Sequence, residues 1–168
     1  MLVRNRKQRG SSTIEFTLVG IPMIFVLVST FEIARGMWMY HTLAYGVKEG
    51  TRYASVHGKA CATAPNNCAV TVSQVAQKIS DSAAGLLPGQ LTLTFTSLSG
   101  TFSCTVTNCL ANNSPWPPDP GNALGSDIQI SGVYPFQSGL AMFWPGAGPG
   151  VNFTVANFPA SSKETMQN

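Results

Sequence analysis

Charged side chains are scarce in this sequence, because Asp, Glu, Lys and Arg together make up 10% of its 168 residues, against roughly a quarter in an ordinary soluble domain. This shortage excludes a disordered tail and a coiled coil rich in Glu and Lys. Four of the ten basic residues lie in the first ten positions, as Arg4, Arg6, Lys7 and Arg9. The rest of the chain has six basic and seven acidic residues, so it lacks the basic face needed to bind nucleic acid.

Catalytic motifs are missing as well. The sequence contains no P-loop, no G-x-G-x-x-G, no G-x-S-x-G and no Ser-His-Asp arrangement. Its two histidines, His41 and His57, are too far apart along one predicted helix to share a metal ion, so we interpret them as solvated or interface residues. We therefore expect neither enzymatic activity nor a cofactor nor a metal ion, and the length favours one domain.

The four cysteines do not have the C-x2-C spacing of a zinc knuckle. They form two local pairs downstream of a hydrophobic segment, which favours two disulfides in an oxidising compartment. Three pairings are possible, and the short loops favour Cys61 with Cys68 and Cys104 with Cys109. Free buried thiols in a cytosolic protein are the alternative interpretation.

What the sequence does have is a long apolar segment near its N-terminus. Residues 11–31 contain a single charged side chain, Glu15, and as a helix they would measure about 30 Å, the thickness of the bilayer hydrocarbon core. The basic residues before this segment predict a cytoplasmic N-terminus, with the chain after Glu32 on the other side of the membrane. A secretory signal peptide cut near Ala34-Arg35-Gly36 is the alternative, but the helical pattern continues past that point.

That continuing pattern predicts one long helix over residues 11–57. Apolar residues recur at helical spacing, and Glu32 with Arg35 and Glu49 with Arg52 form i,i+3 pairs. Pro22, close after Gly20, predicts a bend or a local loosening, which a membrane helix tolerates. The apolar stripe consists of Met37, Tyr40, Ala44 and Val47, and Trp38 and Tyr40 have the character of interfacial anchors.

Glu15 requires an explanation, because a carboxylate inside a membrane helix costs free energy and marks a site with a partner. Cleavage between Gly10 and Ser11 would remove the basic leader and create an α-amino group at Ser11. In parallel, staggered copies of the chain, that amine could meet the Glu15 carboxylate of a neighbour. A Glu15 side chain hydrated by lipid headgroups is the alternative.

The residues around Gly10 and Glu15 have the form G/xxxxE-(F/Y), which resembles the processing site of type IV prepilins. Three further blocks extend the likeness, so that residues 7–57 resemble the TadE-like family of tight-adherence (Flp) pilus assembly. Gly20 and Ile21 lengthen the approach to the proline by one residue, and Thr51 replaces the usual alanine. The matching positions are Glu15, Phe16, Pro22, Glu32, Arg35, Lys48, Glu49, Gly50, Arg52, Tyr53 and Ala54.

The resemblance implies a pseudopilin or minor pilin that a prepilin peptidase cuts after Gly10, with Glu15 and Phe16 docking other subunits. Its implied partners are membrane lipid, other pilins of the system, the peptidase and the pilus assembly platform. Its implied location is the bacterial inner membrane, with a cytoplasmic N-terminus and a periplasmic C-terminal domain. A permanently tethered periplasmic binding or scaffolding domain, which would keep its leader, is the alternative function.

The remaining hundred residues predict a small α+β head. Residues 69–87 have apolar positions at helical spacing, ending near Gly85 or Pro88. Alternating residues then predict strands at 91–96, 102–106, 127–134 and 151–157, with a turn at 97–100 and loops at 112–125 and 145–150. The apolar stretch 134–145 favours core packing over a membrane or subunit contact.

Together these patterns predict an α+β fold in which the long helix carries a three- to four-stranded antiparallel sheet, and the resemblance implies a type IV pilin-like architecture. We divide the chain into a leader (1–10), a membrane half of the helix (11–34), a periplasmic half (35–57) and a head (58–168). Because three or four strands alone have too little core, the sheet must bury its apolar face on the helix.

Overall fold

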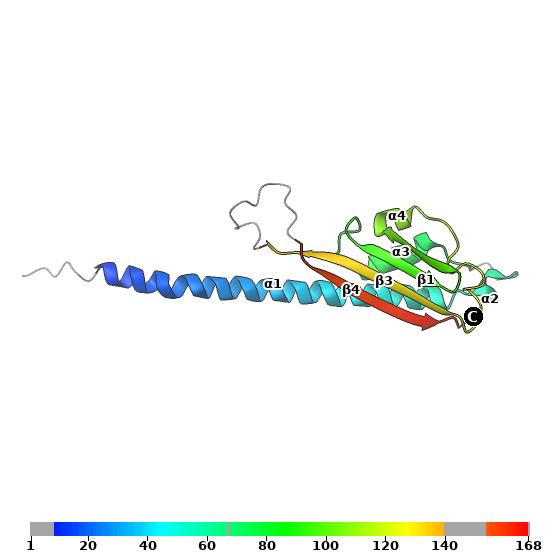
Figure 1. Cartoon of the computed structure of the whole chain (residues 1–168), viewed down its shortest axis with the longest axis horizontal. Helices are drawn as coiled ribbons and strands as arrows, with labels where there is room; N and C mark the ends of the chain where they lie inside the picture. The colour runs from blue at the N-terminus through cyan, green and yellow to red at the C-terminus, as the bar shows by residue number, and fades with distance from the viewer. Residues whose placement is uncertain (1–8, 67, 140–153, 168) are drawn as a thin grey trace, which may run out of the picture.

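The structure is a computed structural model that describes residues 9–66, 68–139 and 154–167. It shows a long helix with a small α+β head packed along its C-terminal half, which confirms the predicted fold class (Figure 1). Most of the predicted leader, the predicted loop at 145–150 and the first three residues of the predicted last strand lie outside the described residues.

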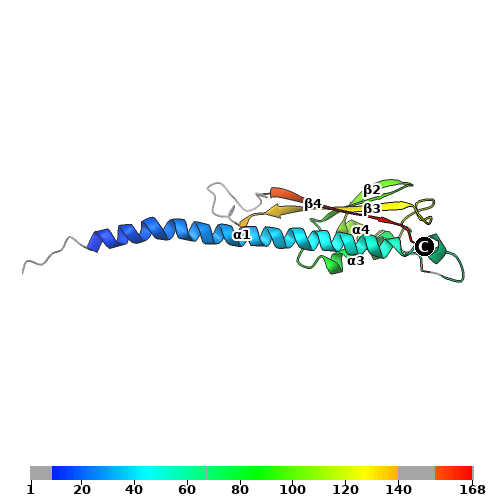
Figure 2. The same cartoon turned by 90° about the horizontal axis from the view of Figure 1, so that it is seen from below.

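The long helix is α1 (Arg9–Ser55), and its 47 residues confirm the prediction of one helix through both halves. It begins and ends two residues before the predicted bounds of 11 and 57. It runs through Pro22 without an interruption, and Figure 2 shows it curving gently in its N-terminal part. Because proline has no backbone N–H, this helix lacks one hydrogen bond at Pro22.

Three short helices belong to the head. The predicted amphipathic helix is α3 (Val72–Ser82), which begins with a capping box between Thr71 and Gln74. The helices α2 (Lys59–Ala62) and α4 (Val106–Leu110) were not predicted.

The prediction that Val106 ends a strand is wrong, because Val106 begins α4. The nearby disulfide supplies the reason. Cys104 and Cys109 have Cα atoms 5.6 Å apart, whereas five residues of extended strand would span about 16 Å. An extended strand therefore cannot continue from Cys104 to Cys109, and the chain leaves β2 after Thr105.

The sheet has the order β2-β1-β3-β4, and every neighbouring pair is antiparallel. Its strands are β1 (Thr92–Ser97), β2 (Gly100–Thr105), β3 (Asp127–Gln137) and β4 (Thr154–Thr165). The first two form the predicted hairpin. β4 continues eight residues past its predicted end, although Pro159 and a polar sequence argue against a strand there; β4 is an edge strand, where proline is tolerated.

The core lies between the inner face of the sheet and the helices α1 and α3 (Figure 2). The helix contributes Leu43, Val47 and Ala54, all fully buried. Met37 and Tyr40, which were predicted to belong to this stripe, are instead 58% and 44% exposed. The sheet and α3 contribute further side chains with no exposed surface: Val75, Ile79, Leu93, Phe95, Ile128 and Ile130.

The N-terminal half of α1 projects beyond the head (Figure 1). Gly36 is its first buried position, and the large apolar side chains before it, apart from Val28, are at least half exposed. By length and composition, α1 is apolar enough to cross a membrane, with a mean hydropathy of 2.0 and no burial in its most apolar window. The chain thus divides into a bare apolar half-helix and a packed head.

Candidate assembly and membrane interface

The predicted processing and docking residues lie at the projecting end of α1. Gly10 and Ser11 fall within its first turn. Glu15 and Phe16 are both exposed, with Phe16 at 78%. At 1.5 Å per residue, Glu15 lies about 32 Å along the helix from the first buried position, Gly36. The head therefore leaves Glu15 and Phe16 accessible to a membrane or to another chain.

Glu32 and Arg35 join α1 to the end of β3. Arg35 Nη2 lies 3.2 Å from Glu32 Oε2, which forms the predicted i,i+3 pair. The same Nη2 also donates to the carbonyl oxygen of Gln137, and the Gly139 amide donates to Glu32 Oε2 at 3.2 Å. The guanidinium carbon lies 5.0 Å from the centre of the Phe136 ring. The pair, which the sequence predicted on the helix surface, therefore also fastens α1 to the end of β3. We call these two residues the Glu32–Arg35 clamp.

The second predicted pair behaves differently. Among the described residues, no ion pair joins Glu49 to Arg52, although both lie on the same helix. Tyr53 is half-buried, and its ring lies 4.6 Å from that of His57. His57 Nδ1 also lies 2.7 Å from the Tyr53 carbonyl oxygen, so His57 has a local structural role at the end of α1.

Gly50 allows α1 to approach α3 closely. A Cβ atom at Gly50 would lie 2.2 Å from Ile79 Cγ1, and one at Gly46 would lie 2.8 Å from Ala83 Cβ. The two glycines are one helical turn apart on the same face. Thr51, at the position where alanine is usual, is fully buried, and its hydroxyl donates to the Val47 carbonyl oxygen at 2.8 Å. Sequence reasoning noted Gly50 but missed Gly46, which the four-residue spacing could have revealed.

The cysteines are joined as Cys61–Cys68 and Cys104–Cys109, the pairing that loop locality favours. The first closes the loop after α2, and the second connects β2 to α4. In the part of the chain that the structure describes, no group of three or more His, Cys, Asp or Glu residues could hold a metal ion.

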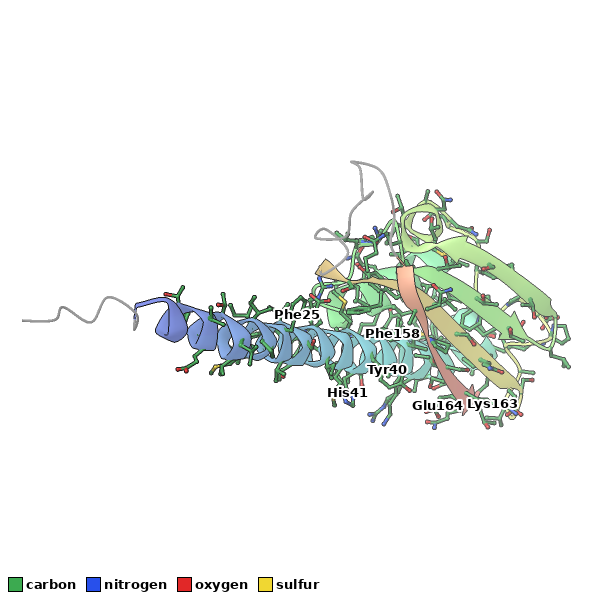
Figure 3. All side chains as sticks on the ribbon, turned by 60° about the vertical axis from the view of Figure 1, so that its left-hand side comes forward. Phe25, Tyr40, His41, Phe158, Lys163 and Glu164 are labelled. Atoms are coloured by element: carbon green, nitrogen blue, oxygen red, sulfur yellow. A yellow bond between two sulfur atoms is a disulfide. The ribbon has the colours of Figure 1, made fainter. Side chains whose placement is uncertain are left out.

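An apolar groove of about 660 Å³ lies where α1 leaves the head. Its walls come from one face of α1 and from the adjoining ends of β3 and β4. Figure 3 shows Tyr40 and Phe158 close together at this place, with their ring centres 6.1 Å apart. Phe136 stacks on Phe158 at 5.2 Å. Of the apolar stretch 134–145, Tyr134 and Phe136 are buried as expected, and residues 140–145 lie outside the described residues.

The lining of the groove has few polar groups. It includes Glu32 at the rim and His41 on the helix, and its remaining side chains are mostly apolar. Trp38, predicted to be an interfacial anchor, is 68% exposed on the same turns of α1. The groove residues are Glu32, Ile33, Gly36, Met37, Tyr40, His41, Phe136, Ser138, Ala156 and Phe158.

At the opposite end of β3, Asp127 carries a perturbed carboxyl group. Lys163 Nζ lies 2.7 Å from Asp127 Oδ2, and the Thr165 hydroxyl donates to Oδ1 at 3.0 Å. These hydrogen bonds, with the lysine charge, lower the pKa of Asp127 below its ordinary value of 3.8. Both side chains of the ion pair are more than half exposed, so this pair is a surface feature.

Comparison with known proteins gives one family match. Residues 10–52 match the family model of TadE-like proteins, which confirms the resemblance found in the sequence. No curated protein and no solved structure matches the chain. The matched segment covers nearly all of α1 and stops before the head, so it includes the predicted processing site, Glu15, the Glu32–Arg35 clamp and Gly50. The match indicates a part in tight-adherence pilus assembly.

Proposed function

We propose that this chain is a pseudopilin or minor pilin that takes part in assembling a tight-adherence (Flp) pilus. The observation that carries the proposal is that the TadE-like match falls on residues 10–52, a helix whose N-terminal half is apolar and bare. Such a helix can lie in a membrane and later pack against the helices of other subunits. The head lies outside the matched segment.

In the proposed pathway, a prepilin peptidase cuts between Gly10 and Ser11 on the cytoplasmic side of the inner membrane. The cut removes four basic side chains and creates a charged amine at Ser11. Glu15 of one copy then pairs with the Ser11 amine of a neighbouring pilin in the low-dielectric membrane. Its partners are therefore other pilins, the peptidase and the assembly platform.

The geometry of the head agrees with an extracytoplasmic location. It contains two disulfides, Cys61–Cys68 and Cys104–Cys109, which persist in oxidising compartments such as the periplasm. The head lies at the C-terminal end of α1 (Figure 1), and the basic leader favours a cytoplasmic N-terminus. We therefore place residues 58–168 in the periplasm.

Mass spectrometry of the N-terminus tests the processing step. Protein isolated from its native host should begin at Ser11, and protein from the same host without its prepilin peptidase should begin at Met1. Finding Met1–Gly10 intact on functional protein would favour the alternative, a permanently tethered periplasmic domain, because a tether has no need to lose its leader.

Substitution of the carboxylate tests the docking step. Glu15→Val should leave membrane insertion and cleavage largely intact and should strongly reduce piliation. Thr17→Val is a matched control, because Thr17 is exposed on the same segment and its hydroxyl donates within the helix, to the Thr13 carbonyl oxygen. Normal piliation of the Glu15→Val strain would remove the carboxylate from the mechanism.

A further inference from the structure

The exposed apolar surface of α1 is longer than the hydrocarbon core of a bilayer. Large apolar side chains with at least half of their surface exposed run from Ile14 to Trp38. These 24 helical steps measure about 36 Å, against a core of about 30 Å. If Ile14 lies at one boundary of the core, about 6 Å of apolar helix extends past the other, into the headgroup layer.

The apolar groove lies at this depth. On the same scale Ile33 lies near the outer boundary of the core, and Met37 lies about 5 Å beyond it. Both line the groove, and both are more than half exposed, at 64% and 58%. Facing them from the head are Phe136 and Phe158. The groove thus extends the apolar surface of the membrane span from α1 onto the adjoining ends of β3 and β4.

Charge at this depth is neutralised within the chain. Glu32, the acidic residue of the groove, has a side chain that is 20% exposed. It pairs with Arg35 and accepts from the Gly139 amide. A satisfied ion pair can lie at a bilayer boundary at much lower cost than a lone carboxylate. The charge of Glu32 therefore does not prevent the groove from lying in the headgroup layer of the membrane.

We propose that the groove is a lipid-binding site, occupied by the upper part of a phospholipid acyl chain from the leaflet nearest the head. The proposal rests on the membrane anchoring that the proposed function includes. Continuity with the apolar span favours lipid over a second copy of the chain, because lipid surrounds the helix at this depth before any subunit docks. The head is then seated on the membrane at two places, the helix and the groove.

Tryptophan quenching by brominated lipid tests the proposal. The full chain is placed in phosphatidylethanolamine–phosphatidylglycerol vesicles that contain phosphatidylcholine with bromine atoms near either end of its acyl chains. Trp38→Phe and Trp144→Phe form the background, which keeps the buried Trp116 (2% exposed) as a constant signal. Phe158→Trp places the reporter in the groove. Bromine near the headgroup should quench this reporter more strongly than bromine near the methyl end, because the groove lies at the boundary of the hydrocarbon core.

Two further reporters make the result decisive. Phe25→Trp in the apolar half-helix (Figure 3) should be quenched best by deep bromine, and Leu98→Trp in the β1–β2 turn, where the side chain is 72% exposed, should not be quenched. If Phe25→Trp is quenched but Phe158→Trp is quenched no more than Leu98→Trp, the groove proposal is overturned and the membrane anchoring stands. Failure of Phe25→Trp would overturn the anchoring instead. Tyr40→Trp, also on the groove, replaces Phe158→Trp if that variant does not fold.

Discussion

Gly50 is the family-motif position with the clearest structural consequence. A Cβ atom there would lie 2.2 Å from Ile79 Cγ1 and 2.7 Å from Ile79 Cδ1, well inside the 3.5–4.0 Å at which carbon atoms attract. Ile79 belongs to α3 and is fully buried in the core beside α1, so its side chain has little space in which to move. Gly50→Ala must therefore separate the two helices or force Ile79 into a poor rotamer.

Two opposing terms set the size of the effect. Overpacking a core by one methyl group costs about 1–3 kcal/mol, while alanine gains roughly 0.8–1 kcal/mol over glycine in a helix. Because the overlap with Ile79 is severe, we expect the cost of overpacking to be at the upper end of its range. The free energy of unfolding should then fall by about 1–2 kcal/mol in Gly50→Ala.

Gly36→Ala is the matched control on the same helix. Its Cβ would lie 3.6 Å from the rings of Phe136 and Phe158, an ordinary contact, so helix propensity should make this variant neutral or slightly more stable. The measurement is urea unfolding of the full chain in detergent, in a Trp38→Phe and Trp144→Phe background, followed by the fluorescence of the buried Trp116. Equal midpoints for Gly50→Ala and Gly36→Ala would refute the close helix approach.

A double-mutant cycle with Ile79 identifies the cause of the loss. Ile79→Ala alone should cost about 2–5 kcal/mol, since it empties a fully buried site. In the double variant, the alanine at position 50 enters the space that Ile79 leaves. The two losses should therefore sum to more than the loss of the double variant, by at least about 1 kcal/mol. Simple additivity would mean that the two side chains do not collide.

Three other predictions concern the clamp, a disulfide and the surface carboxylate. Glu32→Gln should speed hydrogen exchange of the backbone amide just after β3, because it weakens the acceptor of that amide; unchanged exchange would contradict the clamp. Replacing Cys104 and Cys109 by serine should lower the free energy of unfolding by about 2 kcal/mol in urea titrations, since the disulfide restrains a short loop of the unfolded chain. The lowered pKa of Asp127 means that its ionised form contributes stability above pH 3.8, which is lost as pH falls through the folded-state pKa. In Asp127→Asn, the free energy of unfolding should therefore fall less steeply between neutral and acid pH than in the original chain. This difference between the two proteins should be smaller in high salt.

Periodicity was enough to predict most of the fold. The apolar run before Glu32 and the continuing helical pattern predicted α1 through both halves, and alternation predicted the hairpin of β1 and β2. These signals are strong because burial on one face imposes a period of 3.6 or 2 on the sequence.

Other features depend on contacts between distant segments and leave a weak local signal. The end of β4 carries polar residues and Pro159, and it forms a strand because β3 supplies its hydrogen-bond partners along an edge. The change from β2 to α4 at Val106 is different, because it accompanies the local Cys104–Cys109 disulfide, which the sequence predicted but which an alternating pattern does not register. The clamp needs the end of β3 beside Arg35, 102 residues later in the chain, and no local pattern encodes that meeting.

The family-motif residues fall into two groups when each is matched to what it touches. Glu32, Arg35 and Gly50 act in folding, because they hold β3 and α3 against α1. Glu15 lies about 32 Å from the first buried position of the helix, so packing of the head cannot account for a carboxylate there. The proposed function assigns the role of Glu15 to the surroundings of the bare half-helix, the membrane or a neighbouring subunit. Substitutions in the first group should therefore alter unfolding of the head, whereas substitution of Glu15 should alter assembly and leave the unfolding of the head unchanged.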